Sequence, residues 1–441
     1  MDAPLIKTAL PGPQAIEWIG KDQAYVSPSY TRAYPLVVKR AHGVWVHDMD
    51  DNVFLDFTAG IAVCATGHCH PRIVQAIKDQ AETLLHMSGT DFYYGPLIAL
   101  SEKLARMTPG PGGKKVYFGN SGAEAVEAAF KLARWHTKRE LNIAFFGAFH
   151  GRTMGALSLT ASKAIQKKHY NPVVPGITHI PYPYCYRCPY NMPHPDCCLE
   201  CVRWIEDTLF RTTMPPDEVA AIFVEPIQGE GGYIVPPPEF HQQLFKIAQK
   251  YGILYVADEV QSGMGRTGKM FAMEHFGVTP DIIALAKGIA SGLPLGAMIA
   301  RSDIMNWEAG SHASTFGGNP VSCQAALATI QILEEELMTN AEVQGEHLMA
   351  GLRDLQKSFE CIGDVRGKGL MVGVELVKDR VSKERATDWR NSIVRQAFTK
   401  GLLLLGCGDN SIRFCPPLTV TAEQIDLCVS IFGDTVREVA G

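Results

Sequence analysis

An acidic and a basic side chain follow two apolar segments at positions where they could act together. Asp258 ends the segment ILYVAD, and Lys287 directly follows DIIALA, within the otherwise apolar and glycine-rich segment 282–300. A lysine in apolar surroundings needs a chemical reason, because burial penalises its charge. The pair suits a bound group that requires an amine anchor and a counter-charge. A buried ion pair without catalytic function is the alternative.

A run of small and polar residues could bind a phosphate group. Asn120, Ser121, Gly122, Ala123 and Glu124 lie between a predicted strand and a predicted helix. Backbone N–H groups at a helix N-terminus bind anions, and small residues allow a close approach. For this segment alone, a helix start with Ser121 as N-cap and Glu124 completing a capping box is the favoured interpretation.

The glycines that follow Asp258 imitate a dinucleotide-binding motif. Gly263, Gly265 and Gly268 have the spacing G-x-G-x-x-G. Two acidic residues separate them from the strand, and the next stretch, KMFAMEHFG, does not predict a glycine-started helix. A nicotinamide or flavin enzyme is therefore a disfavoured alternative.

Five cysteines gather in one short segment, namely Cys185, Cys188, Cys197, Cys198 and Cys201. The pairs Cys185-x-x-Cys188 and Cys198-x-x-Cys201 have the spacing of zinc knuckles, with Cys197 and His194 as spare ligands. A chance group of reduced cysteines is the alternative. We assign no metal to the catalytic site and leave a structural metal at this cluster open.

The elements that must position these groups alternate between helices and strands from about residue 70. Short apolar runs that end in polar or glycine-containing turns predict buried parallel strands; they are LNIAFFG, VAAIFVEP, ILYVADEV and DIIALAKG. Ligands of such sheets bind at the carboxyl ends of the strands, where Asp258 and Lys287 lie.

Three segments are predicted from this pattern. Residues 1–65, with a hairpin-like alternation and a turn at Asp51-Asn52, form part of a small domain. Residues 66–320 form a large, mostly parallel α/β domain, and residues 321–441 complete the small α+β domain. The two chain ends are expected to pack together.

Composition excludes several classes of protein. The chain has 46 acidic and 41 basic residues, a net charge of −5 and no basic run, so neither a nucleic-acid nor an anionic-membrane surface is indicated. Segment 282–300 is nearly long enough to span a bilayer, but Lys287 and four helix-breaking residues argue against it. The N-terminus lacks the features of a signal peptide, so a cytoplasmic location is expected.

Nine motifs in order resemble the class III (ω-) aminotransferases, which are pyridoxal 5'-phosphate enzymes of fold type I. They are GHCHP (67–71), NSGAEA (120–125), FHGRT (149–153), EPIQGEGG (225–232), DEVQSGMGRTGK (258–269), AKGIASGLPLGA (286–297), STFGGNP (314–320), DVRGKGLMVGVEL (364–376) and SIRFCPP (411–417). The likeness covers nearly the whole chain. It also explains the glycines after Asp258, which belong to the motif DEVQSGMGRTGK.

The resemblance implies a role for each residue of a cofactor site. Lys287 is implied as the Schiff-base lysine and proton shuttle, and Asp258 as the partner of the pyridine nitrogen. Further cofactor contacts are implied for Ser121, Gly122, Ala123, Phe149, Val260 and Gln261. Thr315 is implied to complete the phosphate site of a neighbouring subunit, which predicts a homodimer with shared active sites. His150 is left without a role.

The resemblance also implies the substrate contacts. Arg152 is expected to bind the remote carboxylate of an ω-amino acid, and Arg413 the α-carboxylate of glutamate or 2-oxoglutarate, because a guanidinium engages a carboxylate bidentately. Glu230 is expected to pair with Arg413 when the donor has no carboxylate there. Ile61 stands where ornithine-specific relatives have tyrosine, which disfavours ornithine as donor. The stretch GCGDNSIRF (406–414) resembles 4-aminobutyrate aminotransferases most, so 4-aminobutyrate is the expected donor. Acetylornithine, lysine and diamine transaminases and amino-acid racemases are the alternatives.

Overall fold

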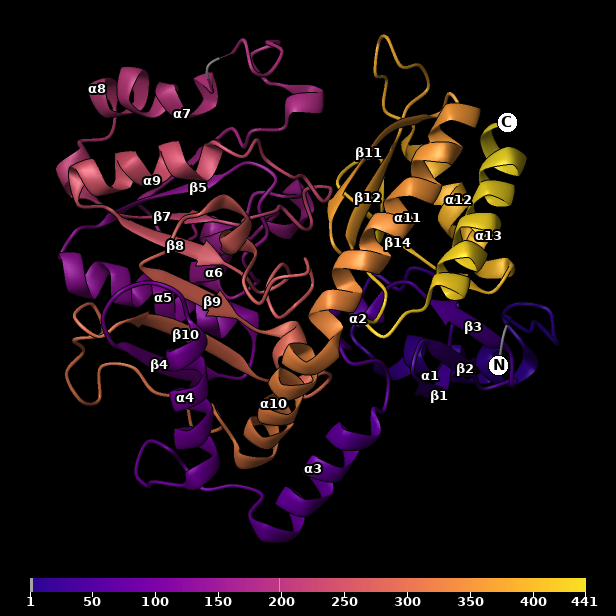
Figure 1. Cartoon of the computed structure of the whole chain (residues 1–441), viewed down its shortest axis with the longest axis horizontal. Helices are drawn as coiled ribbons and strands as arrows, with labels where there is room; N and C mark the ends of the chain where they lie inside the picture. Colours follow the sequence, from indigo (N-terminus) through magenta and orange to yellow (C-terminus); the bar gives the residue numbers. More distant parts are fainter. Residues whose placement is uncertain (1–2, 198) are drawn as a thin grey trace.

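A seven-stranded sheet dominates the computed structural model, which describes residues 3–197 and 199–441 (Figure 1). Its strands lie in the order β4-β10-β9-β8-β7-β5-β6, and within this sheet β10 runs antiparallel to both of its neighbours. The strands are β4 (Lys114–Gly119), β10 (Gly296–Arg301), β9 (Ile282–Leu285), β8 (Leu254–Asp258), β7 (Val219–Val224), β5 (Leu141–Phe145) and β6 (Ile177–Ile180). The predicted mostly parallel sheet is confirmed.

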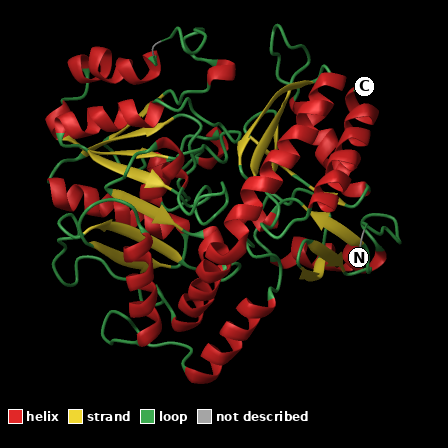
Figure 2. Cartoon of the chain, in the orientation of Figure 1, coloured by secondary structure: helices red, strands yellow, loops and turns green. Residues whose placement is uncertain are grey.

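Helices pack around this sheet, which explains its continuous apolar strands (Figure 2). Every residue of β7 and β9 is buried, as expected of strands covered on both faces. The helices of the first 260 residues are α1 (Pro13–Tyr25), α2 (Ala59–Ala62), α3 (Pro71–Thr83), α4 (Gly95–Met107), α5 (Gly122–Thr137), α6 (Met154–Leu159), α7 (Glu200–Trp204), α8 (Phe210–Thr212) and α9 (Phe240–Tyr251). Helix α5 packs against β4, β7, β8, β9 and β10.

Helix α5 begins where the sequence predicts, but its cap differs from the predicted one. The Ser121 hydroxyl accepts a hydrogen bond from the Glu124 N–H at 3.2 Å, as a cap should. The Glu124 carboxylate does not return this bond to Ser121; it accepts from the backbone N–H and the side-chain amide of Asn120. The predicted capping box is therefore wrong, and Glu124 instead braces the residue that precedes the cap.

Two four-stranded sheets lie outside the large sheet, and the first of them combines strands from both chain ends. The first has the order β1-β2-β3-β13, and the second β11-β12-β15-β14. Their strands are β1 (Val38–His42), β2 (Trp45–Asp48), β3 (Val53–Asp56), β13 (Leu402–Leu403), β11 (Ile362–Lys368), β12 (Met371–Leu376), β15 (Ser411–Phe414) and β14 (Leu405–Cys407). Because β13 pairs with β3 in parallel, the expected packing of the two chain ends is confirmed. The domain limits after residues 65 and 320 stay a prediction.

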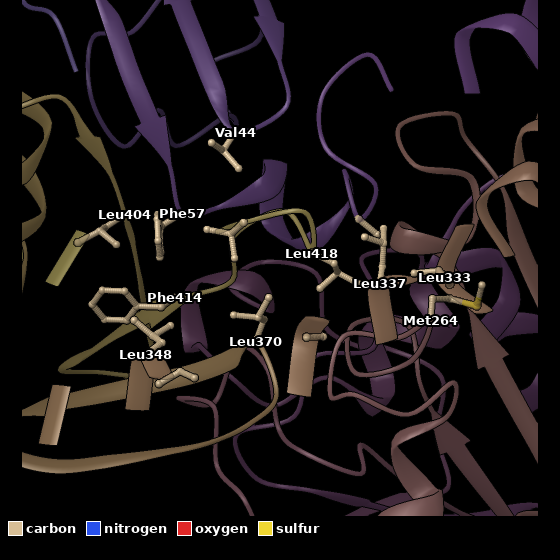
Figure 3. Close-up of a cluster of buried hydrophobic side chains, with 14 of the residues drawn as sticks. Val44, Phe57, Met264, Leu333, Leu337, Leu348, Leu370, Leu404, Phe414 and Leu418 are labelled. Atoms are coloured by element: carbon tan, nitrogen blue, oxygen red, sulfur yellow. The ribbon is translucent and has the colours of Figure 1, made fainter. Parts of the chain in front are cut away.

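A long helical segment runs from the large sheet to the region of the chain ends (Figure 1). It comprises α10 (Pro320–Ile332), a π-helical turn η7 (Leu333–Leu337) and α11 (Met338–Ser358), and α12 (Thr387–Thr399) and α13 (Ala422–Ala440) follow. A buried cluster joins this helix to both regions, and Figure 3 shows Phe57, Met264, Leu337 and Phe414 among its side chains. Within the described residues, no helix is long and apolar enough to cross a membrane.

Candidate active site

A cavity of about 500 Å³ lies at the carboxyl ends of β8 and β9. Most of the predicted cofactor and substrate residues line it: Ser121, Gly122, Ala123, Phe149, Arg152, Asp258, Val260, Gln261 and Lys287. His150 and Glu225 line it as well. The volume is in the usual range for small-molecule sites. Residues from Ser121 to Lys287 thus converge because parallel strands end at one edge of the sheet.

Lys287 and Asp258 reach this cavity from neighbouring strands. Asp258 is the last residue of β8 and pairs in register with Ala284 of β9, and Lys287 opens the short helix η6 (Lys287–Ala290) just beyond β9. Lys287 has a left-handed backbone, with φ of 46°, a conformation uncommon for a residue other than glycine. Burial and then the positive charge of Arg413 lower the pKa of Lys287, while Asp258 opposes them. A lowered pKa favours the neutral amine, which is the nucleophilic form.

His150 acquires a role that its sequence position did not predict. Its Nδ1 lies 2.7 Å from Oδ2 of Asp258, and both side chains are buried. Burial is the largest single effect and lowers the pKa of His150, but the hydrogen bond and negative charge of Asp258, together with the charge of Glu225, outweigh it and raise that pKa overall. His150 therefore fixes the Asp258 carboxylate. In the sequence, only the position of His150 next to Phe149 in FHGRT placed it near the site. That position did not predict its contact with Asp258.

Glu225 is a second residue to which the sequence gave no role. Its carboxylate accepts hydrogen bonds from the N–H groups of Phe149 and Gly229, at 3.2 and 3.0 Å. Burial, only partly opposed by His150, raises the pKa of Glu225 to about 7. It joins the loop that carries Phe149 to the loop that carries Glu230.

Arg413 and Glu230 form an ion pair whose charges both act on the pKa of Lys287, although neither residue is among the described residues that line the cavity. Arg413 Nη1 lies 3.2 Å from Glu230 Oε2, and Arg413 is only 6% exposed. Among the described residues, Nε and Nη1 of Arg413 have no hydrogen-bond partner, so the guanidinium has donors available for a ligand. The second Glu230 oxygen lies 2.5 Å from Nζ of Lys163, which the sequence did not single out. Burial raises the pKa of Glu230, but Arg413 and Lys163 outweigh it and lower that pKa.

Comparison with known proteins identifies the family. The model of the class-III aminotransferase family matches residues 25–436. The chain belongs to the class-III aminotransferases. It is 42% identical to an alanine/serine racemase of Pyrococcus horikoshii, over 99% of this chain and 94% of the relative, and 39% identical to a 4-aminobutyrate aminotransferase of Mycobacterium leprae, over 97% of both. An amine transaminase of an uncultivated Pseudomonas species, solved in its pyridoxal-phosphate-bound form, has a TM-score of 0.87 at 30% identity and covers 94% of this chain and 98% of its own.

This class-III aminotransferase is accordingly a pyridoxal-phosphate enzyme of fold type I, and its cavity fits that cofactor. Gly122 and Ala123 are the first residues of α5, so no helical carbonyl is within reach of their N–H groups. A Cβ at Gly122 would stand 2.8 Å from Cγ1 of Val260, so a side chain there would displace Val260 from the cavity wall. The N-terminus of α5, a lysine and a carboxylate therefore line one cavity, as a cofactor with a phosphate group requires.

Three further predicted residues of the aminotransferase surround this space. The Arg152 guanidinium lies 5.7 Å from the centre of the Phe149 ring, and Arg152 is exposed at the cavity mouth. The Gln261 carbonyl accepts a hydrogen bond from the Tyr233 hydroxyl at 2.9 Å. This bond fixes the Gln261 side chain and leaves its NH₂ group as the donor for a ligand.

Ile61 and Thr315 are not among the described residues that line the cavity. Thr315 is exposed, and Ile61 is 42% exposed. Ile61 belongs to a left-handed turn, Ala59–Ala62, in which all four residues have positive φ. Such a turn costs about 1–2 kcal/mol for each L-residue and needs support. The Asp56 carboxylate provides support, because it accepts hydrogen bonds from the N–H groups of Thr58 and Ala59.

The other oxygen of Asp56 pairs with His68, and this contact predicts a pH-dependent stability. The two atoms are 2.8 Å apart. Burial lowers the pKa of His68, but the bonds to Asp56 and Cys64 raise it to about 10. Because the pKa of His68 is raised in the folded state, the stabilisation that the pair gives is fully present below the unfolded pKa of about 6.5. This stabilisation is lost as the pH rises through the folded pKa. We expect unfolding free energy to fall by on the order of 2 kcal/mol over that window.

Denaturant unfolding at several pH values checks this expectation. His68→Gln keeps a donor for Asp56 but does not titrate, so its stability should fall less than that of the wild type over the same window. The exposed His42→Gln is the control and should follow the wild type. Equal pH slopes in His68→Gln and the wild type would show that the pair does not stabilise the turn.

Proposed function

We propose that this enzyme transfers the amino group of an ω-amino acid, with 4-aminobutyrate as the preferred donor, to 2-oxoglutarate. The observation that carries this proposal is the ion pair between the buried Arg413 guanidinium and the Glu230 carboxylate. With Glu230 in place, the site accepts a donor that has no carboxylate beside its amine. With Glu230 turned away, the unpartnered donors of Arg413 bind the α-carboxylate of an oxo acid.

The second arginine supports a substrate with a distant carboxylate. Arg152 is exposed at the cavity mouth, whereas Arg413 is buried. A four-carbon or five-carbon chain with charged groups at both ends would use both arginines, one at a time or together. The relative named 4-aminobutyrate aminotransferase, 39% identical over 97% of this chain, supports the same class of donor.

The residues of the site suggest how the reaction proceeds. Bound pyridoxal phosphate supplies a ring that accepts the electron pair left when a proton leaves the amine-bearing carbon. Lys287 would anchor the cofactor and, once released as a neutral amine, move the proton at Nζ. Asp258, fixed by His150, would hold the positive charge of the ring nitrogen. Phe149 and Val260 would enclose the ring and exclude water from it.

An amino-acid racemase is the second candidate, because the alanine/serine racemase of P. horikoshii is 42% identical over 99% of this chain. Transaminases of acetylornithine, lysine or diamines remain further alternatives on the same scaffold. The substrate and product of a racemase carry the same carboxylate. Arg413 would therefore not have to bind substrates with and without a carboxylate in turn. The ion pair of Arg413 with Glu230 favours the transaminase, because its opening would let Arg413 bind such substrates in turn.

A panel of single donors tests the proposal. The holoenzyme is incubated with 4-aminobutyrate, acetylornithine, ornithine, lysine or alanine, without any oxo acid. A transaminase should lose the visible absorbance of its cofactor with 4-aminobutyrate and regain it with 2-oxoglutarate, as a ping-pong mechanism requires. Inversion of alanine with the visible band retained would instead assign a racemase.

Lys163 is expected to stabilise the open position of Glu230. When an oxo acid occupies Arg413, Glu230 must leave that residue, and Lys163 at 2.5 Å can retain its charge. Lys163→Met should therefore raise KM for 2-oxoglutarate about 3- to 10-fold, the equivalent of about 1 kcal/mol, and leave the half-reaction with 4-aminobutyrate unchanged. Steady-state and single-turnover kinetics measure the two effects. The exposed Lys168→Met is the control, and an unchanged KM in Lys163→Met would refute this role.

We also propose a homodimer with shared active sites. Exposed apolar side chains of Leu85, Phe92, Tyr93 and Phe316 support it, and Phe316 follows Thr315 directly. The His86 and Phe316 rings are 5.0 Å apart, so these segments lie side by side. Light scattering and the activity of hybrids between Lys287→Ala and Thr315→Ala subunits test this proposal. The cytoplasmic location stays a prediction of the sequence.

A further inference from the structure

Four of the clustered cysteines line one small cavity outside the active site. Cys185, Cys188, Cys197 and Cys201 surround a space of about 10 Å³, which has room for a single ion or water molecule. They come from two short pieces of chain, the 3₁₀ helix η2 (Cys185–Arg187) with the residue after it, and the start of α7 with the loop before it. Nothing in the transamination chemistry uses these thiols.

The ligand set differs from the spacing that the sequence suggested. Cys197 lies in the cavity wall, whereas the expected Cys198 lies outside the described residues. His194, the other spare ligand, lies 3.8 Å from Glu239 and is not among the described residues of this cavity wall. The four remaining residues form a C-x-x-C and a C-x-x-x-C pair, which is a usual arrangement for a tetrahedral Cys₄ site.

The four thiols lie around one cavity but do not yet have the geometry of a metal site. Among the described residues, no three His, Cys, Asp or Glu side chains already have the arrangement that holds a metal ion. Cys197 and Cys201 are buried, while Cys185 is exposed and Cys188 is partly buried on the adjoining loop. An ion arriving from solvent would therefore meet two fixed ligands and two that can turn towards them. Without an ion, four protonated thiols gain little from mutual contact.

The segment that carries Cys185 and Cys188 is bonded to strand β12 through its neighbouring side chains. The Tyr184 hydroxyl and Arg187 Nε both donate hydrogen bonds to the buried carboxylate of Glu375. Strand β12 pairs with β15, which carries Arg413. Cys185 directly follows Tyr184, and Cys188 directly follows Arg187. A metal ion bound by these cysteines would therefore fix the two side chains that contact β12, the strand next to the one that carries Arg413.

We propose that Cys185, Cys188, Cys197 and Cys201 bind one zinc ion, which clips this segment and fixes Tyr184 and Arg187 against β12. Four sulfur–zinc bonds form, and the thiols release their protons to solvent, so the step needs no oxidant or reductant. Zinc suits the site because it favours four thiolate ligands in a tetrahedral arrangement and does not change its oxidation state. The ion is structural, because four protein ligands leave no open position for a substrate.

Metal analysis of the purified holoenzyme tests the proposal directly. After incubation with zinc chloride and gel filtration, we expect one zinc ion per wild-type chain. The Cys188→Ser and Cys201→Ser variants should lose most of this zinc. Cys69→Ser, an exposed cysteine outside the cluster, is the matched control and should retain the metal. Wild-type protein that carries no zinc, or variants that keep it, would overturn the proposal. Disulfides among these cysteines in the native protein would overturn it as well.

A second measurement keeps the test decisive if a serine variant does not fold. The wild-type metal is removed with a chelator and replaced by Co²⁺, whose tetrahedral thiolate complexes absorb in the red, away from the visible band of the cofactor. We expect this red absorption, and faster proteolysis between residues 183 and 201 in the metal-free protein. Absence of the cobalt bands, or a cleavage rate that does not respond to metal, would refute the clip.

Discussion

Lys287→Ala is expected to lower transamination by roughly 10⁴-fold, the upper range for a positioned acid–base group. The variant would lose both the amine proposed to anchor the cofactor and the base proposed to move the proton. No neighbouring lysine can substitute for it among the described residues, because Lys287 is the one lysine that lines the cavity. Its left-handed backbone, with φ of 46°, aims the side chain from a fixed position beyond β9. We expect loss of the visible band that the lysine-bound cofactor gives the wild type.

Two controls separate this chemical loss from a general loss of structure. Lys167→Ala removes a partly buried lysine outside the cavity, whose Nζ donates to the Ser158 carbonyl, and it should keep both colour and activity. A small exogenous amine added to Lys287→Ala should restore part of the proton transfer, because it enters the space that the side chain vacated. Wild-type turnover in Lys287→Ala would refute the catalytic assignment.

Asp258→Asn is expected to lower turnover by roughly 10²- to 10³-fold, as the removal of a preorganised electrostatic group does. The amide has the shape of the carboxylate and can still contact His150 at Nδ1, which lies 2.7 Å from Oδ2. The negative charge is lost, however, and in this buried position no solvent replaces it. Cofactor affinity and the single-turnover rate of the half-reaction measure the effect.

His150 provides the matched comparison for Asp258. If His150 acts by fixing the carboxylate, His150→Asn should reduce turnover less than Asp258→Asn, and the double variant should lose little more than Asp258→Asn alone. Asp281→Asn is the external control, because Asp281 pairs with Arg301 just before β9 starts, away from the carboxyl ends. Asp281→Asn should affect stability and leave the half-reaction intact. Full additivity of Asp258→Asn and His150→Asn would show that the two residues act separately.

The sequence alone determined the sheet and the place of the chemistry, because both follow from local patterns. Continuous apolar runs such as those of β7 and β9 predict strands buried on both faces, and polar residues directly after β8 and β9 predict a site at one sheet edge. The N-terminal limit of α5 followed from Ser121 for the same local reason. The family resemblance then supplied the cofactor and the residues around it.

Only the tertiary structure decided which distant side chains meet, because such contacts depend on how strands and loops far apart in the chain are brought together. No spacing in the sequence pairs His150 with Asp258, Lys163 with Glu230, or His68 with Asp56. A periodic pattern fixes which face of an element is buried, but the partner of a buried charge is fixed by packing between elements. Lys287 was therefore predictable as an anomaly, whereas its supporting contacts were not.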